Sequence, residues 1–318
     1  MKLGLETESY HLWFQHGRME IIGFIERVAE LGLDGVQINL VKHYNQNDWG
    51  VLGSIDSSHL KRVRQAIEYY NFFVELDTIT TDSKHLRDVL NVASCIGADR
   101  IRTCIRHPGI FSPAACDTTV KDIKSVLPDL ESKRITLSLE NHEEETADEI
   151  LDMISQINSP WVGVHCDIGN PMMAWEDPVE AVKKLAPHTF TTHFKDHIVI
   201  PHGDEFYVCG VPLGDGNINL DECFNHLVHN SSLTRIVHEM CYPYCSPFRR
   251  APGTGGVHSL GSGAFSIESP LYTDLAPDHY YHPHEVSNEL LEELIDSQDK
   301  GVKKGVAVLK ALRDKHSR

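Results

Sequence analysis

RITLSLE at residues 134–140 and WVGVHCD at residues 161–167 are two short apolar segments that each end in a carboxylate. An amphipathic stretch lies between them, and it begins at Thr146 with Glu149 three residues later, the spacing of a helix-capping box. A strand, a capped helix and a second strand of this length form the crossover unit of a parallel sheet. The stretch therefore predicts parallel β-structure with helices packed outside it.

The same alternation recurs along the whole chain of 318 residues. Neighbouring apolar segments lie mostly roughly 25 to 45 residues apart, as complete crossovers require. No glycine-rich GxGxxG or GxxxxGK turn follows the first segment, which argues against a nucleotide-binding open sheet. We therefore expect residues 1–318 to form one (β/α)8 TIM barrel. The expected strands are 3–6, 34–39, 72–77, 99–104, 134–140, 161–167, 189–194 and 234–239.

The periodicity fails after the eighth expected strand. Residues 241–286 are rich in proline, glycine, aromatic residues and histidine, and we expect a long, aperiodic loop that covers the active site. An oligomer contact is the alternative role for this segment. Residues 287–314 are predicted to form a terminal helix, with lysines near its end as the helix dipole favours.

The composition is that of a globular, acidic protein, with 41% apolar residues and a formal charge of −17. Such a surface repels nucleic acid and anionic membranes, so neither is expected as a partner. Because no apolar stretch is long enough for a signal peptide or a membrane helix, we expect a cytoplasmic protein. The eight cysteines are scattered, which suggests reduced thiols.

Four polar side chains end the last four expected strands: Glu140, Asp167, His193 and Glu239. In a parallel barrel the carboxyl ends of the strands meet at one rim, where the active site lies. Three carboxylates there would repel one another, and a divalent cation with one imidazole ligand resolves that conflict. We therefore predict one divalent metal ion, and the ligand set suits Mn²⁺, Co²⁺, Mg²⁺ or Zn²⁺, with manganese favoured.

These residues stand in four strings: LSLENHEEETADEIL (137–151), VGVHCDIGNP (162–171), TTHFKDH (191–197) and IVHEMCYP (236–243). Together, in this order, they resemble the xylose isomerase-like TIM-barrel superfamily of sugar-phosphate isomerase and epimerase-type proteins. The resemblance implies that the same four residues bind the metal and that Glu140 and Glu239 move protons at a substrate carbon. The ketose 3-epimerase branch has a histidine three residues after its strand-six aspartate, whereas this chain has Asn170.

Further candidates lie beside these residues. His142, two residues beyond Glu140, could carry a proton or contact the substrate. The alternative is that it only orients a metal-binding side chain. Asn170 could bind a substrate hydroxyl, and Lys195 resembles the lysine of the superfamily's HxKD element, with a surface ion pair as the alternative. Strand alternation places His165 inside the barrel beneath the metal and turns His238 outward.

Arginines suggest an anionic substrate. Arg102 and Arg106 flank the end of the fourth expected strand, and Arg249 and Arg250 lie in the long loop. A neutral sugar does not need guanidinium groups, whereas a carboxylate or phosphate binds them in a bidentate manner. Solvated loop arginines are the alternative.

The leading interpretation is an enzyme whose metal polarises the oxygens of a keto sugar and stabilises an enediolate. The arginines and the long loop favour a lyase that decarboxylates a 3-oxo sugar acid, resembling the 3-oxo-isoapionate decarboxylase-like branch. A sugar isomerase or epimerase, for example similar to D-apiose isomerases, is the first alternative. A subunit that cleaves 3-oxo-C-glycosides is the second.

Two other classes are disfavoured. A repair endonuclease of the same superfamily would need more metal ligands and a basic surface, and a non-catalytic barrel would not need four intact ligands. We expect a small sugar or sugar-acid substrate and a homo-oligomer, with a partner subunit of another kind left open.

Overall fold

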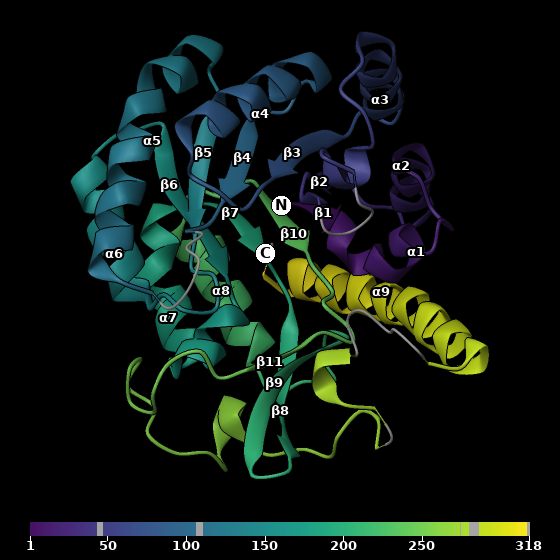
Figure 1. The fold of residues 1–318 in the computed structure, drawn as a ribbon, viewed down its shortest axis with the longest axis vertical. Coiled ribbons are helices and arrows are strands. Elements are labelled where there is room, and N and C mark those ends of the chain that lie inside the picture. The colour runs from purple at the N-terminus through teal and green to yellow at the C-terminus, as the bar shows by residue number, and fades with distance from the viewer. Residues whose placement is uncertain (43–46, 106–110, 274, 280–285, 317–318) are drawn as a thin grey trace.

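Eight parallel strands form a ring in the computed structural model, which describes residues 1–42, 47–105, 111–273, 275–279 and 286–316 (Figure 1). Each strand follows its neighbour in the order β10-β1-β2-β3-β4-β5-β6-β7. The ring closes between β7 and β10, where Phe194 N donates to Val237 O at 2.8 Å. The strands are β1 (Lys2–Glu6), β2 (Gly35–Asn39), β3 (Phe73–Asp77), β4 (Arg100–Thr103), β5 (Thr136–Glu140), β6 (Val162–Asp167), β7 (Thr189–His193) and β10 (Arg235–His238). The predicted (β/α)8 TIM barrel is confirmed.

Helices surround the ring and bury one apolar face each. The Thr146 hydroxyl and the Glu149 carboxylate form the predicted capping box at α6, and Gly97 ends α4 with φ of 86°. The helices are α1 (His11–Gln15), α2 (Ile21–Glu30), α3 (Ser57–Tyr69), α4 (Ser83–Ile96), α5 (Pro113–Lys133), α6 (Ala147–Ile157), α7 (Pro178–Leu185), α8 (Leu220–Asn230) and α9 (Asn288–His316). Short 3-10 helices are η1 (Thr7–Tyr10), η3 (Gly50–Leu52), η4 (Asn170–Ala174), η5 (Ala186–His188), η6 (Gly263–Phe265) and η7 (Pro277–His279).

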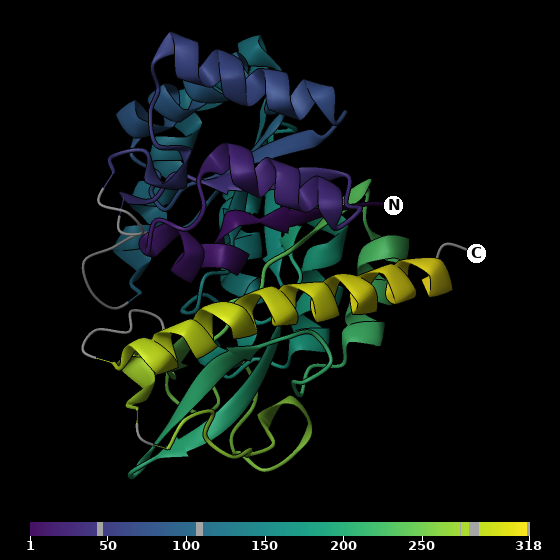
Figure 2. The same cartoon turned by 90° about the vertical axis from the view of Figure 1, so that its right-hand side faces the viewer.

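A second, three-stranded sheet was not predicted. β8 (Asp196–His202) and β9 (Glu205–Val211) form a hairpin directly after β7, and β11 (Cys245–Pro247) pairs with β9. This sheet projects from the barrel on the opposite side of α9 from α1 and α2 (Figures 1 and 2). Cys209 of β9 and Cys245 of β11 form a disulfide, so the expectation that all thiols are reduced is wrong for this pair.

The segment after β10 is more ordered than the sequence suggested. Besides β11, backbone bonds tie it to the barrel: Arg249 N donates to Met173 O at 2.9 Å and Val257 N donates to Trp175 O at 2.9 Å. The ring of Trp175 also stacks on Phe248. The expected long loop after the eighth strand is thus present as a segment docked on the barrel, and its role as a cover of the active site stays a prediction. Residues 274 and 280–285 of this loop lie outside the described residues.

The predicted terminal helix is α9, which crosses the molecule beside β10 (Figure 2). Gly305 of α9 lies so close to His238 that a Cβ there would be 2.3 Å from His238 Nε2. His238 is buried and its Nδ1 bonds Phe194 O at 2.9 Å, outside the ring of strands as expected. Among the described residues, no helix is long and apolar enough to cross a membrane.

Candidate active site and metal centre

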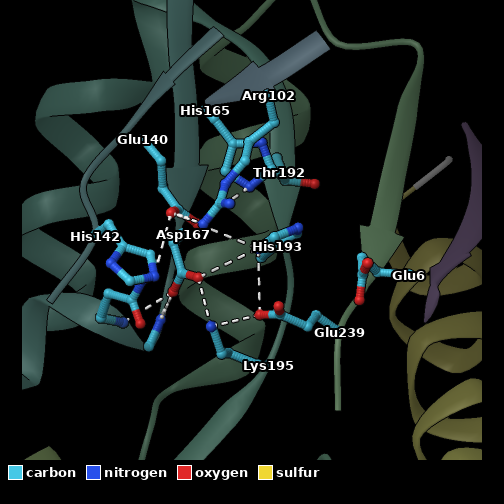
Figure 3. Close-up of polar contacts among 12 residues, drawn as sticks. Glu6, Arg102, Glu140, His142, His165, Asp167, Thr192, His193, Lys195 and Glu239 are labelled. Atoms are coloured by element: carbon cyan, nitrogen blue, oxygen red, sulfur yellow. Dashed lines mark hydrogen bonds and ion pairs between the residues drawn. The ribbon is translucent and has the colours of Figure 1, made fainter. Parts of the chain in front are cut away.

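The four strand-end residues converge at one point inside the rim of the barrel (Figure 3). His193 Nδ1 lies 3.2 Å from Glu140 Oε1, 3.6 Å from Asp167 Oδ2 and 3.2 Å from Glu239 Oε2. All four side chains are buried, and they come from the ends of β5, β6, β7 and β10. The parallel ladder brings them together, since Asp167 and His193 are direct register partners.

Four of the facing atoms form no well-aligned hydrogen bond within the described part of the chain, although Lys195 forms ion pairs with two of them: Glu140 Oε1, Asp167 Oδ2, His193 Nδ1 and Glu239 Oε2. Buried polar atoms that converge without well-aligned hydrogen bonds are suited to bind a cation. Ligand atoms bound at about 2.1 Å lie about 3.0 Å apart in an octahedron and about 3.4 Å apart in a tetrahedron. The three separations from His193 Nδ1 lie near these values. Asp167, His193 and Glu239 form one group of side chains that could hold a metal ion, and Glu140 with His165 and His193 forms a second, overlapping group.

The charges around this point also fit a cation. Lys195 Nζ lies 2.6 Å from Asp167 Oδ2 and 2.5 Å from Glu239 Oε2, so one ammonium offsets one of the three carboxylates. Arg102 is shared between Glu140 and a fourth carboxylate, Asp77, so two negative charges remain, which a divalent ion would balance. Burial alone would raise the pKa of Asp167, but Lys195 and His193 lower it to about 2. The carboxylate therefore stays ionised and available as a ligand.

The ligands are themselves held by other side chains. The guanidinium of Arg102 contacts Asp77 Oδ1 at 2.5 Å and also contacts Glu140 Oε2, which leaves Glu140 Oε1 facing His193. His165 lies behind the cluster, where its Nδ1 contacts Thr191 Oγ1 at 2.7 Å. Burial, followed by the charges of His193 and Arg102, holds the pKa of His165 well below its usual range. His165 is thus neutral inside the barrel, at the position that strand alternation predicts.

A cavity of about 400 Å³ opens above the cluster. His142, Asn170, Lys195 and Glu239 all line it, so these predicted site residues do share one space. His142 Nε2 lies 4.0 Å from Glu140 Oε2, and Asn170 Nδ2 is buried without a partner among the described residues. Apolar side chains in the lining include Val41, Ile79, Ile105 and Phe111. Polar groups cover most of the rest, as a small polyhydroxylated ligand requires.

The predicted anion-binding arginines occupy different places. Arg102 lines the floor of the cavity but is 4% exposed and contacts the two carboxylates described above. The Arg249 side chain is 36% exposed at the cavity wall, and its Nε donates to Glu143 Oε2 at 2.8 Å. Arg250 is absent from the described lining, because its guanidinium contacts Glu149 and covers the ring of Phe111. Arg106 lies outside the described residues.

Several functional neighbours were not predicted. Glu6 and Gln37 are fully buried beside the cluster, and His193 Nε2 contacts Gln37 Oε1. His197 lines the cavity next to Lys195. Asp196 of the HxKD element does not pair with Lys195 but accepts backbone N–H groups, including Gly214 N at 2.9 Å. Strand alternation could have found Gln37 and Glu6, because both face inward from predicted strands.

The ring of eight parallel strands and the carboxylate–imidazole cluster at its rim define a TIM barrel with a candidate metal centre. The model of the family described as "Xylose isomerase-like TIM barrel" matches residues 25–255. The chain belongs to this family.

Three comparisons illustrate the range of similar proteins. The 3-oxo-isoapionate decarboxylase of Pectobacterium atrosepticum is 26% identical over 200 residues, which cover 62% of this chain and 69% of that protein. The structure of a D-psicose 3-epimerase, solved in the presence of D-fructose, aligns over 100% of both chains with a TM-score of 0.64 and 15% identity. The IOLI protein with a bound zinc atom aligns over 96% of this chain and 98% of its own, with a TM-score of 0.64 and 14% identity. The two structures support the fold alone.

Proposed function

We propose that this protein is a divalent-metal-dependent enzyme of carbohydrate catabolism that acts on a small keto sugar or 3-oxo sugar acid. The observation that carries the proposal is the convergence of three buried carboxylates, Glu140, Asp167 and Glu239, around His193 Nδ1 at the floor of a polar cavity. A divalent ion held by these residues supplies electrophilic stabilisation of negative charge on a substrate oxygen. The reaction favoured is decarboxylation of a 3-oxo sugar acid.

The residues around the cavity suit that reaction. Loss of CO₂ from a 3-oxo acid leaves the electron pair of the broken C–C bond in an enediolate, which must then gain a proton at carbon. Lys195 Nζ and Glu239 Oε2 lie 2.5 Å apart, so a proton shared between them can be delivered into the cavity. Arg249 would bind the substrate carboxylate at the wall, because its guanidinium is partly exposed there and can form a bidentate pair.

A sugar isomerase or epimerase is the second candidate. Glu140 and Glu239 each place a carboxylate oxygen 3.2 Å from His193 Nδ1. Two carboxylates at one site are suited to removing a proton from a carbon and returning one to another. This reaction needs no carboxylate-binding arginine.

Incubation of the metal-loaded enzyme with a panel of 3-oxo sugar acids and neutral ketoses in deuterated water separates the two candidates. CO₂ trapped from a sugar acid, dependent on added Mn²⁺ and lost in Asp167→Ala, supports the decarboxylase. Deuterium uptake into a neutral ketose without CO₂ release from any acid would instead establish the isomerase. An Asp167→Ala variant with full activity would contradict both.

The adjacent arginines provide a matched pair of variants for the carboxylate contact. Arg249→Lys keeps the charge but loses the bidentate fork, so kcat/KM for the sugar acid should fall by about 10- to 100-fold, or about 1.4–2.7 kcal/mol. Arg250→Lys should leave it unchanged, since Arg250 points to Glu149 instead of the cavity. Metal content should match the wild type in both variants. An equal effect of the two substitutions would reject Arg249 as the carboxylate-binding residue.

A further inference from the structure

A line of buried polar side chains crosses the barrel interior from β10 to the candidate metal centre. Arg235 Nε donates to Glu75 Oε1 at 2.5 Å, Gln37 Nε2 donates to Glu75 Oε2 at 3.0 Å, and Gln37 Oε1 contacts His193 Nε2. Gln37 and Glu75 are fully buried and neighbour each other in the ladder between β2 and β3. None of the proposed metal-binding or substrate-binding roles involves Arg235, Glu75 or Gln37.

The chemistry of this line fixes the direction of every hydrogen bond. The Glu75 carboxylate, paired with Arg235, can only accept, so the Gln37 group that faces it must be the amide NH₂. The carbonyl oxygen of the same amide then faces His193 and can only accept in turn. His193 Nε2 must therefore carry a proton, and a neutral ring has its lone pair on Nδ1.

Nδ1 is the nitrogen that faces Glu140, Asp167 and Glu239. We propose that Gln37, oriented by Glu75 and Arg235, is the positioning residue that holds His193 with Nε2–H inward and Nδ1 presented to the metal. Partners behind a metal-binding histidine generally orient the ring, select its tautomer and contribute 10- to 100-fold to metal affinity. Here the partner of His193 is the neutral amide of Gln37, and the Glu75 carboxylate on the neighbouring strand β3 sets the orientation of that amide.

Four forms of the protein test this assignment: wild type, Gln37→Met, the exchange Gln37→Glu with Glu75→Gln, and Ser138→Ala. Gln37→Met keeps the side-chain length but removes both polar groups. The exchange variant moves the negative charge from position 75 to position 37 and keeps the chain of hydrogen bonds. The amide at position 75 can donate to the carboxylate at position 37, and that carboxylate can accept from His193. Ser138→Ala is the matched control, since Ser138 is also buried but belongs to β5 and takes no part in the line.

The first measurement is the dissociation constant for Mn²⁺. Gln37→Met should weaken binding by about 10- to 100-fold, while the exchange variant should bind within about threefold of wild type and Ser138→Ala should be unchanged. Thermal unfolding of the metal-free proteins checks that all four are folded. Wild-type affinity in Gln37→Met overturns the proposal. So does an exchange variant that is folded but binds as weakly as Gln37→Met, because the residues would then act through packing alone.

The second measurement uses the metal-free protein, because the affinity measurement alone rests on the proposed function. In ¹⁵N-histidine-labelled protein, the His193 Nε2–H resonance, assigned with His193→Gln, should exchange slowly and appear downfield. The resonance should disappear in Gln37→Met and persist in the exchange variant. A wild-type protein that binds no divalent ion but retains this pattern would reject the metal-dependent function and keep the positioning role. A missing signal in wild type, or an unchanged one in Gln37→Met, would reject the positioning role.

Discussion

His197 is a buried imidazole in the wall of the cavity, and it packs closely on Gly169, where a Cβ would lie 2.5 Å from His197 Cε1. Burial lowers its pKa to about 4, and the neighbouring Lys195 ammonium acts in the same direction. The ring is therefore neutral near pH 7. A neutral imidazole has one donor and one acceptor, which suits a substrate hydroxyl better than a carboxylate.

The free energy of unfolding should decrease as the pH falls from about 6.5 to about 4 in part because of His197. Its pKa in the folded protein is lower than that of an unfolded histidine, about 6.5, so the unfolded chain binds a proton first. The contribution of His197 to the free energy of unfolding is fully present above pH 6.5. Below pH 6.5 it decreases by no more than about 1.4 kcal/mol per pH unit.

Chemical denaturation across this pH range measures the effect. The difference in unfolding free energy between wild type and His197→Asn should shrink as the pH falls. A constant difference for His197→Asn would contradict a neutral, buried His197.

The barrel strands could be predicted because each is a short apolar run with a polar residue at its end, and all eight occur where expected. The hairpin of β8 and β9 was missed although its two-residue Gly203-Asp204 turn, with φ of 61° at Gly203, is a recognisable hairpin signal. Because the hairpin follows β7 directly, β8 and β9 fall within the expected connection between β7 and β10. The pairing of Cys209 with Cys245 was out of reach because it depends on the β9–β11 register, which no local pattern specifies.

Some contacts of the candidate site could also be predicted from the sequence, and others could not. Glu140, Asp167, His193 and Glu239 could be predicted to meet, since parallel strands align their carboxyl ends. The contacts of Arg102 could not, because they depend on the ladder that sets Arg102 beside Asp77 on one side and Ser138 on the other. The crossing from Gln37 to His193 likewise depends on the diameter of the closed ring.

The disulfide should hold the segment after β10 against the hairpin. It closes a sequence separation of 36 residues, so Cys245→Ser should lower the free energy of unfolding by roughly 2–4 kcal/mol. Limited proteolysis of residues 247–270 should become faster, because β11 would be attached to β9 by its few ladder bonds alone. Cys95→Ser, at an exposed free cysteine, is the control and should change neither property. Equal cleavage rates in both variants would contradict this role of the disulfide.

Helix α9 packs against both chain neighbours of Glu239, one of the proposed metal ligands. His238 packs against Gly305, and Met240 packs against Gly301, where a Cβ would lie 2.5 Å from the Met240 sulfur. Both glycines lie on the helix face that covers β10. The position of Glu239 therefore depends on a close helix–strand approach formed more than 60 residues later in the sequence.

Gly305→Ala should test that dependence. The added methyl group must displace the His238 ring, so we expect a loss of about 1–3 kcal/mol in stability, together with weaker Mn²⁺ binding. Gly23→Ala in α2 is the control, since a Cβ there meets nothing within 4 Å and should stabilise the helix by roughly 0.5–1 kcal/mol. Denaturation and metal titration of both variants provide the comparison. Unchanged Mn²⁺ affinity in a destabilised Gly305→Ala would show that the packing does not reach Glu239.

The order of the elements along the chain bears on when the proposed metal centre could form during synthesis on the ribosome. A nascent chain that has released β1 to β7 carries Glu140, Asp167 and His193, but the ring is still open on the side that β10 fills. Even after β10 emerges, the strand lacks the glycine surface of α9 against which His238 and Met240 pack. If these four residues hold a divalent ion as proposed, the ligand set would be complete only after β10 has closed the ring. An mRNA truncated before α9 would yield a chain with every proposed ligand present and no organised centre to hold them.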